Sequence, residues 1–154
     1  MKMKPSSRRI SPVALSLAVQ YASRARHLPT RAQFRRWIKA ALQHDASITL
    51  RIVDEPEGRK LNRKFSGGDY ATNVLTFVYD DNEGDVVICA PVVEREAGLQ
   101  HRDLLAHYAH LAIHAALHLQ GYEHDSDADA AAMETLESAL MLKLRYPDPY
   151  QADS

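Results

Sequence analysis

Four short stretches of the chain are predicted to be β-strands: two alternate hydrophobic and polar residues, a third is rich in β-branched and aromatic residues, and a fourth follows a predicted turn. The stretches cover residues 13–20, 48–52, 73–79 and 85–89. In the second stretch, Ile48, Leu50 and Ile52 occupy every other position. Such spacing turns one face of a strand toward a core and the other face toward solvent.

Five other stretches are predicted to be helices, from apolar residues every three or four positions or from helix-start signals. They cover residues 31–43, residues 57–65, a short segment from Pro91, residues 103–119, and a segment that starts at Asp125 and ends before Pro147. Thr30 and Asp103 are suitable N-caps. Interleaved strands and helices predict one α+β (mixed α/β) domain over residues 1–154, with 1–12 as a flexible N-terminus.

The composition predicts a globular domain and bears on the cellular compartment in which it works. Hydrophobic residues make up 45% of the chain and charged residues 25%, which is typical of a globular domain. No apolar run reaches the roughly 18 residues of a membrane span, so we expect no membrane partner. Cys89 is the only cysteine, which excludes an intrachain disulfide and favours a reducing, cytoplasmic location. We expect Cys89 to be a buried apolar residue.

The net charge of −1 conceals two halves of opposite charge. Residues 1–77 hold 15 Lys and Arg against 5 Asp and Glu, a net charge of +10, whereas residues 78–154 hold 4 against 15, a net charge of −11. This split favours a basic face for a polyanion beside an acidic, metal-bearing part. Mutual pairing of the two halves after folding is the alternative.

Six of the eight histidines lie between residues 101 and 124, and three of them form a pattern typical of a metal site. His114 and His118 lie four residues apart on the predicted helix, so their rings share one face. Gly121 then turns the chain and returns His124, which completes the pattern H-x3-H-x2-G-x2-H. Three imidazoles favour one zinc ion per chain with a fourth position open to water. We expect His107 and His110 to be core residues, and Asp125 and Asp127 to be candidate acceptors for the imidazole N–H groups.

The same histidine spacing occurs in metzincin peptidases, whose general base is a glutamate directly after the first histidine. Here that position is Ala115, which cannot accept a proton. The pattern therefore favours a metal-activated water without that peptidase base, so that His114, His118 and His124 act in catalysis through the metal.

Three motifs resemble those of the YbeY family of bacterial endoribonucleases. The first, residues 114–124, is similar to the family pattern H-G-x-L-H-L-x-G-Y-D-H. The second is Gly67-Gly-Asp-Tyr-Ala-Thr-Asn-Val-Leu-Thr-Phe77, and the third is Gly84-Asp-Val-Val-Ile-Cys89. The resemblance extends over nearly the whole chain from about residue 13, and it implies a mixed four-stranded sheet with about five helices. It also implies zinc on His114, His118 and His124, and cleavage of single-stranded RNA in maturation of the 3′ end of 16S rRNA and in ribosome quality control.

One departure from the family pattern concerns catalysis. Ser66 occupies the position where the family typically has an arginine that is expected to meet a phosphate of the RNA. Neighbouring cations on the predicted helix 57–65 could replace it. The candidate RNA-binding residues are Arg59, Lys60, Arg63 and Lys64. The alternative for this cluster is a solvated helix face.

Two other functions remain open from the sequence. The first is a different zinc metallohydrolase, such as a peptidase or an amidase. The second is a non-catalytic, zinc-containing factor that associates with the ribosome or its small subunit.

Overall fold

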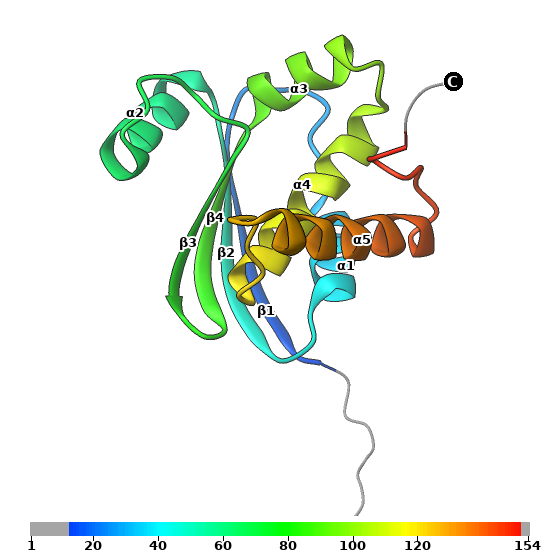
Figure 1. Cartoon of the computed structure of the whole chain (residues 1–154). Coiled ribbons are helices and arrows are strands. Elements are labelled where there is room, and N and C mark those ends of the chain that lie inside the picture. The colour runs from blue at the N-terminus through cyan, green and yellow to red at the C-terminus, as the bar shows by residue number, and fades with distance from the viewer. Residues whose placement is uncertain (1–12, 152–154) are drawn as a thin grey trace, which may run out of the picture.

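The computed structural model describes residues 13–151, so the predicted flexible N-terminus 1–12 lies outside the described residues. Four strands and five helices follow one another along this part of the chain (Figure 1). The strands are β1 (Leu15–Ala22), β2 (Ala46–Val53), β3 (Val74–Asp80) and β4 (Glu83–Cys89). The helices are α1 (Arg31–Ala41), α2 (Glu55–Ser66), α3 (Ala90–Leu99), α4 (Leu104–Leu119) and α5 (Asp127–Lys143). The predicted fold class is confirmed.

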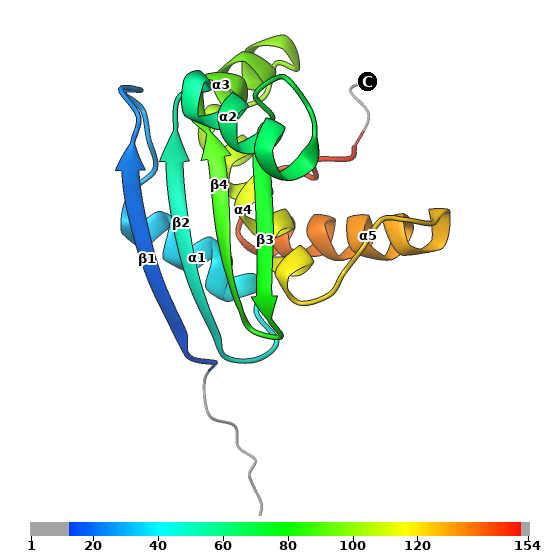
Figure 2. The same ribbon diagram turned by 90° about the vertical axis from the view of Figure 1, so that its left-hand side faces the viewer.

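The four strands form one mixed sheet in the order β1-β2-β4-β3 (Figure 2). β1 and β2 are parallel, as are β2 and β4, whereas β3 runs antiparallel to β4. A short turn between Asp80 and Glu83 connects β3 to β4, which is the connection that an antiparallel pair permits. β1 and β3 are therefore the two edges of the sheet.

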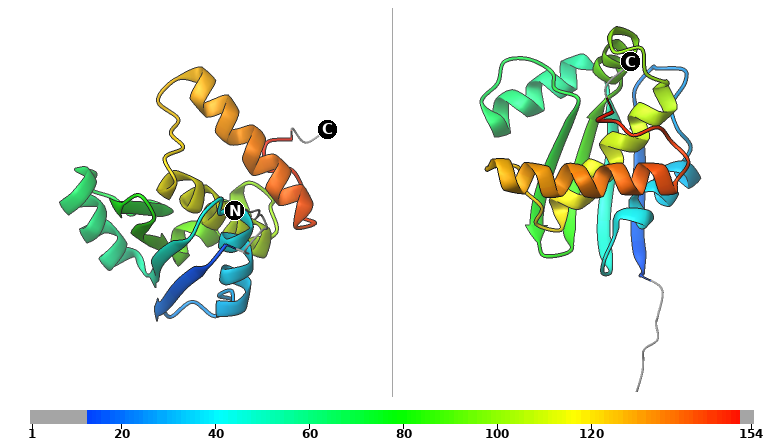
Figure 3. Two further views of the ribbon diagram at one scale, coloured as in Figure 1. Left: turned by 90° about the horizontal axis from the view of Figure 1, so that it is seen from below. Right: turned by 45° about the vertical axis from the view of Figure 1, so that its right-hand side comes forward.

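The two faces of the sheet are covered differently. α1 and α4 pack on one face, and the main core contains Leu50 and Ile88 of the sheet, Trp37 of α1 and Leu117 of α4. A smaller cluster on the other face joins Val53, Val87 and Cys89 to Leu61 of α2. α1 and α2 consequently lie on opposite faces of the sheet, as Figure 1 and Figure 3 show.

The two predicted N-caps are confirmed, whereas some predicted helix bounds differ: α2 starts at Glu55 and not at residue 57, and α5 starts at Asp127 and not at Asp125. Thr30 accepts a hydrogen bond from the backbone N–H of Gln33, and the Gln33 side chain accepts one from the N–H of Thr30. Asp103 accepts one from the N–H of Ala106. α1 ends at Ala41 and not at residue 43, because Leu42 adopts an extended backbone.

α4 is the central helix of the molecule. Eleven of its 16 residues are buried, because it contacts α1, α3, α5 and the sheet. Like the other helices within residues 13–151, it is not long and apolar enough to cross a membrane. The histidine-bearing helix is thus held firmly, which is what a precise site requires.

Gly84 allows the end of α4 to approach the sheet. A Cβ atom at this position would overlap the side chain of Leu119 and the backbone carbonyl of Phe77. The backbone carbonyl belongs to β3, which is paired with β4, so it has little room to move. The absence of a side chain therefore determines where the C-terminal end of α4 lies.

We expect Gly84→Ala to lower the free energy of unfolding by about 1–3 kcal/mol, because the added methyl group overpacks this contact. Gly98→Ala is the matched control, since no atom lies within 4 Å of a Cβ at that helical position. It should leave the stability unchanged or raise it by up to about 1 kcal/mol. Urea denaturation measures both, and equal stabilities of the two variants would contradict the expectation.

Candidate metal centre

The three histidines of the predicted metal site lie together in the structure. His114 and His118 are on successive turns of α4, and Gly121, with φ of +98°, reverses the chain after the helix. This left-handed conformation is one that glycine adopts readily. The ring centroid of His124 then lies 5.9 Å from that of His114 and 6.2 Å from that of His118.

The acceptor beside His114 determines which of its nitrogens carries the proton. Nδ1 of His114 lies 2.6 Å from Oε2 of Glu137, and an ionised carboxylate can only accept a hydrogen bond. Nδ1 is therefore the N–H donor. In the neutral ring this leaves the lone pair on Nε2 for a ligand.

The same reasoning holds for His118. Its Nδ1 lies 3.0 Å from the backbone carbonyl oxygen of Tyr122, which is also only an acceptor. In the neutral ring, Nε2 of His118 therefore has a lone pair available for a metal ion, as does Nε2 of His114. Metal-binding histidines commonly have their other ring nitrogen oriented in this way.

These donors fit a borderline divalent metal such as zinc, which prefers imidazole nitrogen. Two imidazoles on one zinc ion have ring centroids roughly 5 Å apart, from Zn–N bonds of about 2.1 Å. Within residues 13–151, no three His, Cys, Asp or Glu side chains already meet the distances of an assembled metal site. The exposed His124 ring would therefore have to approach the other two by about 1 Å on binding.

Glu137 of α5 is the residue that organises this centre. Its side chain is fully buried and accepts hydrogen bonds from His114, from Nε2 of His110 at 2.8 Å, and from the hydroxyl of Tyr150. Burial raises the pKa of the Glu137 carboxyl, but the hydrogen bonds from His110, His114 and Tyr150 outweigh it and lower that pKa to about 2. Glu137 is therefore an anion and an acceptor at neutral pH.

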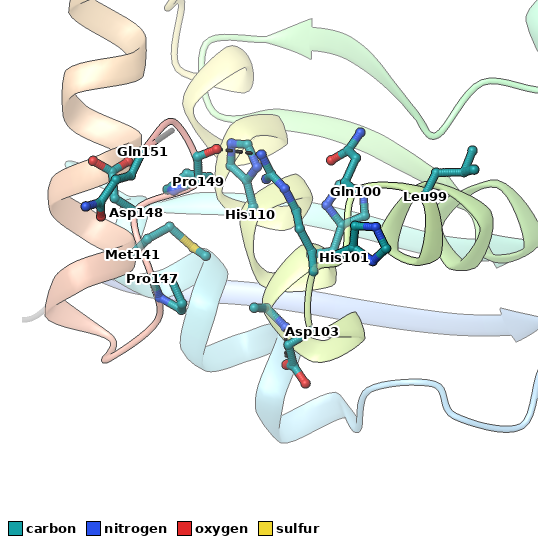
Figure 4. Close-up of a pocket in the computed structure, with 13 residues that line it drawn as sticks. Leu99, Gln100, His101, Asp103, His110, Met141, Pro147, Asp148, Pro149 and Gln151 are labelled. Carbon is teal, nitrogen blue, oxygen red and sulfur yellow. Dashed lines mark hydrogen bonds between the residues drawn. The ribbon is translucent and has the colours of Figure 1, made fainter. Parts of the chain in front are cut away.

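The chain after α5 contributes to the same network. The guanidinium of Arg102 donates to the carbonyl of Pro149 at 2.5 Å, at the edge of a pocket of about 560 Å³ (Figure 4). Ser138 donates to Asp148 at 2.7 Å and holds the same segment. These bonds bring Tyr150 back to α4, where its ring packs edge-on against His110.

A second pocket, of about 530 Å³, opens beside His118 and is a candidate site for a substrate. It is lined by side chains from three separate segments: His44 after α1, Val78 and Asn82 of the β3–β4 hairpin, and Glu123 of the turn after α4. A group bound there would contact His118 directly.

The other predicted residues have different surroundings. Arg59 and Arg63 of α2 both contact Asp69, at 2.9 and 3.5 Å, and the bond from Arg59 keeps the pKa of Asp69 below its usual value. Ser66, the last residue of α2, is exposed. α2 stands over the face of the sheet opposite to α4, so the structure does not bring these cations together with the histidines.

Cys89, His107 and His110 were predicted to be core residues, and the structure shows the surroundings of each. Cys89 is buried, as predicted, and burial raises the pKa of its thiol. His107 is 5% exposed and contacts Glu96 at 2.9 Å, so its role as a core residue is confirmed. His110 is nearly as well buried, with 12% of its side chain exposed, and its hydrogen-bond partner is Glu137 of the candidate metal centre.

The expected acceptors Asp125 and Asp127 were the wrong carboxylates. Within residues 13–151 the carboxylate that accepts from His114 belongs to Glu137. A signal for it was present in the sequence, because Glu137 lies between Met133 and Met141 at spacings of four, on a buried stripe of α5. A single acidic residue in such a stripe requires hydrogen-bond donors.

Comparison with known proteins decides the family. The profile of the family described as "Endoribonuclease YbeY" matches residues 19–145. This chain belongs to the endoribonuclease YbeY family. The predicted resemblance and the prediction of an RNA-cleaving enzyme are therefore confirmed at the level of the YbeY family.

Relatives and a solved structure agree with this assignment. The chain is 54% identical to "Endoribonuclease YbeY" of Nitrosospira multiformis, over 92% of this chain and 85% of that protein. It is 56% identical to the protein of the same name from Nitrosomonas eutropha, over 87% of this chain and 97% of that protein. The solution structure of TM1509 from Thermotoga maritima superposes with a TM-score of 0.57 at 22% identity, and covers 88% of this chain and 99% of TM1509. The last comparison supports the fold alone.

We expect Glu137→Gln to lower the free energy of unfolding by about 2–4 kcal/mol, because an amide accepts fewer of the three donors and directs its own N–H groups at an imidazole. Glu134→Gln removes an exposed carboxylate from the same helix and should change stability by less than about 0.5 kcal/mol. Thermal unfolding of both metal-free variants tests this. Equal losses would show that Glu137 has no special role.

Proposed function

We propose that this chain is a zinc-dependent, single-strand-specific endoribonuclease that acts in maturation of the 3′ end of 16S rRNA and in ribosome quality control in the cytoplasm. His114, His118 and His124 hold one zinc ion, and RNA bound to the small ribosomal subunit is the substrate. Membership of the YbeY endoribonuclease family supports RNA hydrolysis. The observation that carries the metal assignment is the pair of acceptors that leaves Nε2 of His114 and His118 free.

Each residue of the centre has a role that follows from its contacts. Glu137 and the Tyr122 carbonyl hold the rings of His114 and His118 in orientation, and the Tyr150 hydroxyl holds Glu137. When bound, zinc would stabilise the charge on a phosphoryl oxygen as a Lewis acid and would lower the pKa of a water molecule bound to it to near neutrality. The pocket beside His118 would position the phosphodiester next to the ligands.

The surroundings of the histidines favour this reaction over peptide hydrolysis. Ala115, at the position of the metzincin glutamate, is buried in α4. Glu137 cannot take the place of that base, because it is fully buried and accepts bonds from two histidines and a tyrosine. A phosphodiester needs an activated water and positive charge for the developing dianion, and neither of these requires a carboxylate base.

We expect the wild-type protein to bind about one zinc per chain and His118→Ala to lose it, because two remaining imidazoles hold the ion poorly. EDTA should abolish cleavage of single-stranded RNA, and added zinc should restore it. Elemental analysis and a gel-based cleavage assay measure these outcomes. His27→Ala, a change far along the sequence, is the control. Stoichiometric zinc in His118→Ala would place the metal elsewhere.

We also expect Ser66→Arg to accelerate RNA cleavage at unchanged zinc content. Ser66 ends α2, on the face of the sheet opposite to α4, so a guanidinium there would contact a phosphate of the bound RNA away from the histidines. Serine lacks the charge and bidentate reach for that contact. Single-turnover cleavage by wild type, Ser66→Arg and Ser66→Lys measures the gain. No acceleration in Ser66→Arg, together with loss of cleavage in Arg63→Ala, would assign the missing contact to Arg63.

A further inference from the structure

The positive charge of the chain is concentrated before residue 45. Residues 13–44 contain six Lys and Arg and no Asp or Glu. Four of the six cations lie on α1, namely Arg31, Arg35, Arg36 and Lys39. α2 is also rich in basic residues, but it contains or adjoins acidic residues, which α1 lacks.

The cations of α1 lie on its solvent face. Phe34, Trp37 and Ile38 are buried against the core, whereas Arg35, Arg36 and Lys39 are exposed. The exposed residues at 31, 35 and 39 are four apart, which places them along one stripe that extends about 12 Å. The stripe is therefore a continuous basic surface and not a scattered set of charges.

These cations are also unneutralised. Within residues 13–151, none of Arg35, Arg36 and Lys39 lies within 4 Å of a carboxylate, while ion pairs do form at Arg51, Arg59, Arg63 and Arg95. Arg31 differs, since it donates to the carbonyl of Val19 at 3.2 Å and stacks on Tyr21. Arg31 keeps its charge, but these contacts hold its guanidinium against β1, so Arg35, Arg36 and Lys39 are the α1 cations whose side chains can reach a ligand.

The C-terminal end of α1 is attached by hydrogen bonds to the turn between α4 and His124. The side chain of Gln120 accepts from the N–H of Gln43 at 2.7 Å and donates to the carbonyl of Ala41 at 2.8 Å. Gln43 in turn donates to the hydroxyl of Tyr122 at 2.8 Å. The next residue, His44, lines the pocket beside His118. The basic stripe therefore leads to the candidate substrate pocket, on the same face of the sheet as α4.

We propose that Arg35, Arg36 and Lys39 bind successive phosphates of the RNA strand whose scissile part occupies the pocket beside His118. This inference rests on the proposed function, and it assigns the RNA path to α1 in place of α2. A repeating line of phosphates suits a line of free cations, since each contact releases a counterion. The α2 cations are less suited, because Arg59 and Arg63 already share Asp69.

The test compares RNA binding by the wild type and the triple variant Arg35→Gln, Arg36→Gln and Lys39→Gln. Glutamine keeps the helix propensity and removes only the charge. The dissociation constant of a long single-stranded RNA is measured at several KCl concentrations in EDTA, so that no cleavage intervenes. We expect binding to weaken on the order of 10- to 100-fold, and the slope of log K against log salt to become shallower by about 2, from roughly 0.7 per lost phosphate contact.

Two further variants make the result specific. Arg95→Gln on α3, Lys143→Gln at the end of α5 and Arg145→Gln after it together remove the same formal charge from exposed positions. This variant should bind RNA as the wild type does. Neutralising Arg59, Lys60, Arg63 and Lys64 should weaken binding less than the α1 variant.

An unchanged dissociation constant and slope in the α1 variant would overturn the proposal and leave an acidic protein as the partner for this face. An equal effect of the α3/α5 control would overturn it too, as a general effect of net charge. RNA binding by a wild type that never cleaves would contradict the proposed function and leave the α1 inference intact.

Discussion

The candidate metal centre depends on the hydrogen bonds of the buried Glu137 carboxylate. An ionised carboxylate without partners is very costly to bury, so α5 packs against α4 only where His110, His114 and Tyr150 supply donors. The same requirement determines the protonation of His114, because its Nδ1 must carry the hydrogen. The need to satisfy this carboxylate thus positions α5, holds Tyr150 of the C-terminal segment against it, and leaves Nε2 of His114 as a candidate ligand nitrogen.

The sheet explains why this centre lies where it does. β3 and β4 form a tight antiparallel pair at one edge, and Gly84 lets the end of α4 lie directly on it. The turn at Gly121 therefore emerges beside the hairpin, where His124 and the pocket beside His118 are open to solvent. The candidate ligands lie at the boundary between a rigid core and an accessible surface, which suits a large substrate such as RNA.

Charge and topology together separate the two basic helices. Both α1 and α2 expose several cations, but the sheet lies between them, and only α1 shares a face and a hydrogen-bonded junction with the histidine-bearing helix. Asp69 reduces the charge of α2 further. Proximity to the candidate metal ligands, and not the density of basic residues, distinguishes the surface that we propose guides RNA.

The sequence by itself determined the number and order of the helices and strands, the fold class, and the choice of His114, His118 and His124 as candidate metal ligands. Periodicity, caps and the H-x3-H-x2-G-x2-H spacing are local properties of the chain, so they can be read without the tertiary structure. The sequence also carried the motifs of the YbeY family. The tertiary structure alone decided which carboxylate meets His114, since Glu137 and Tyr150 are 23 and 36 positions away along the chain. It likewise decided which cations are free, because the ion pairs of Arg59 and Arg63 and the separation of α1 from α2 arise only when the sheet brings distant segments together.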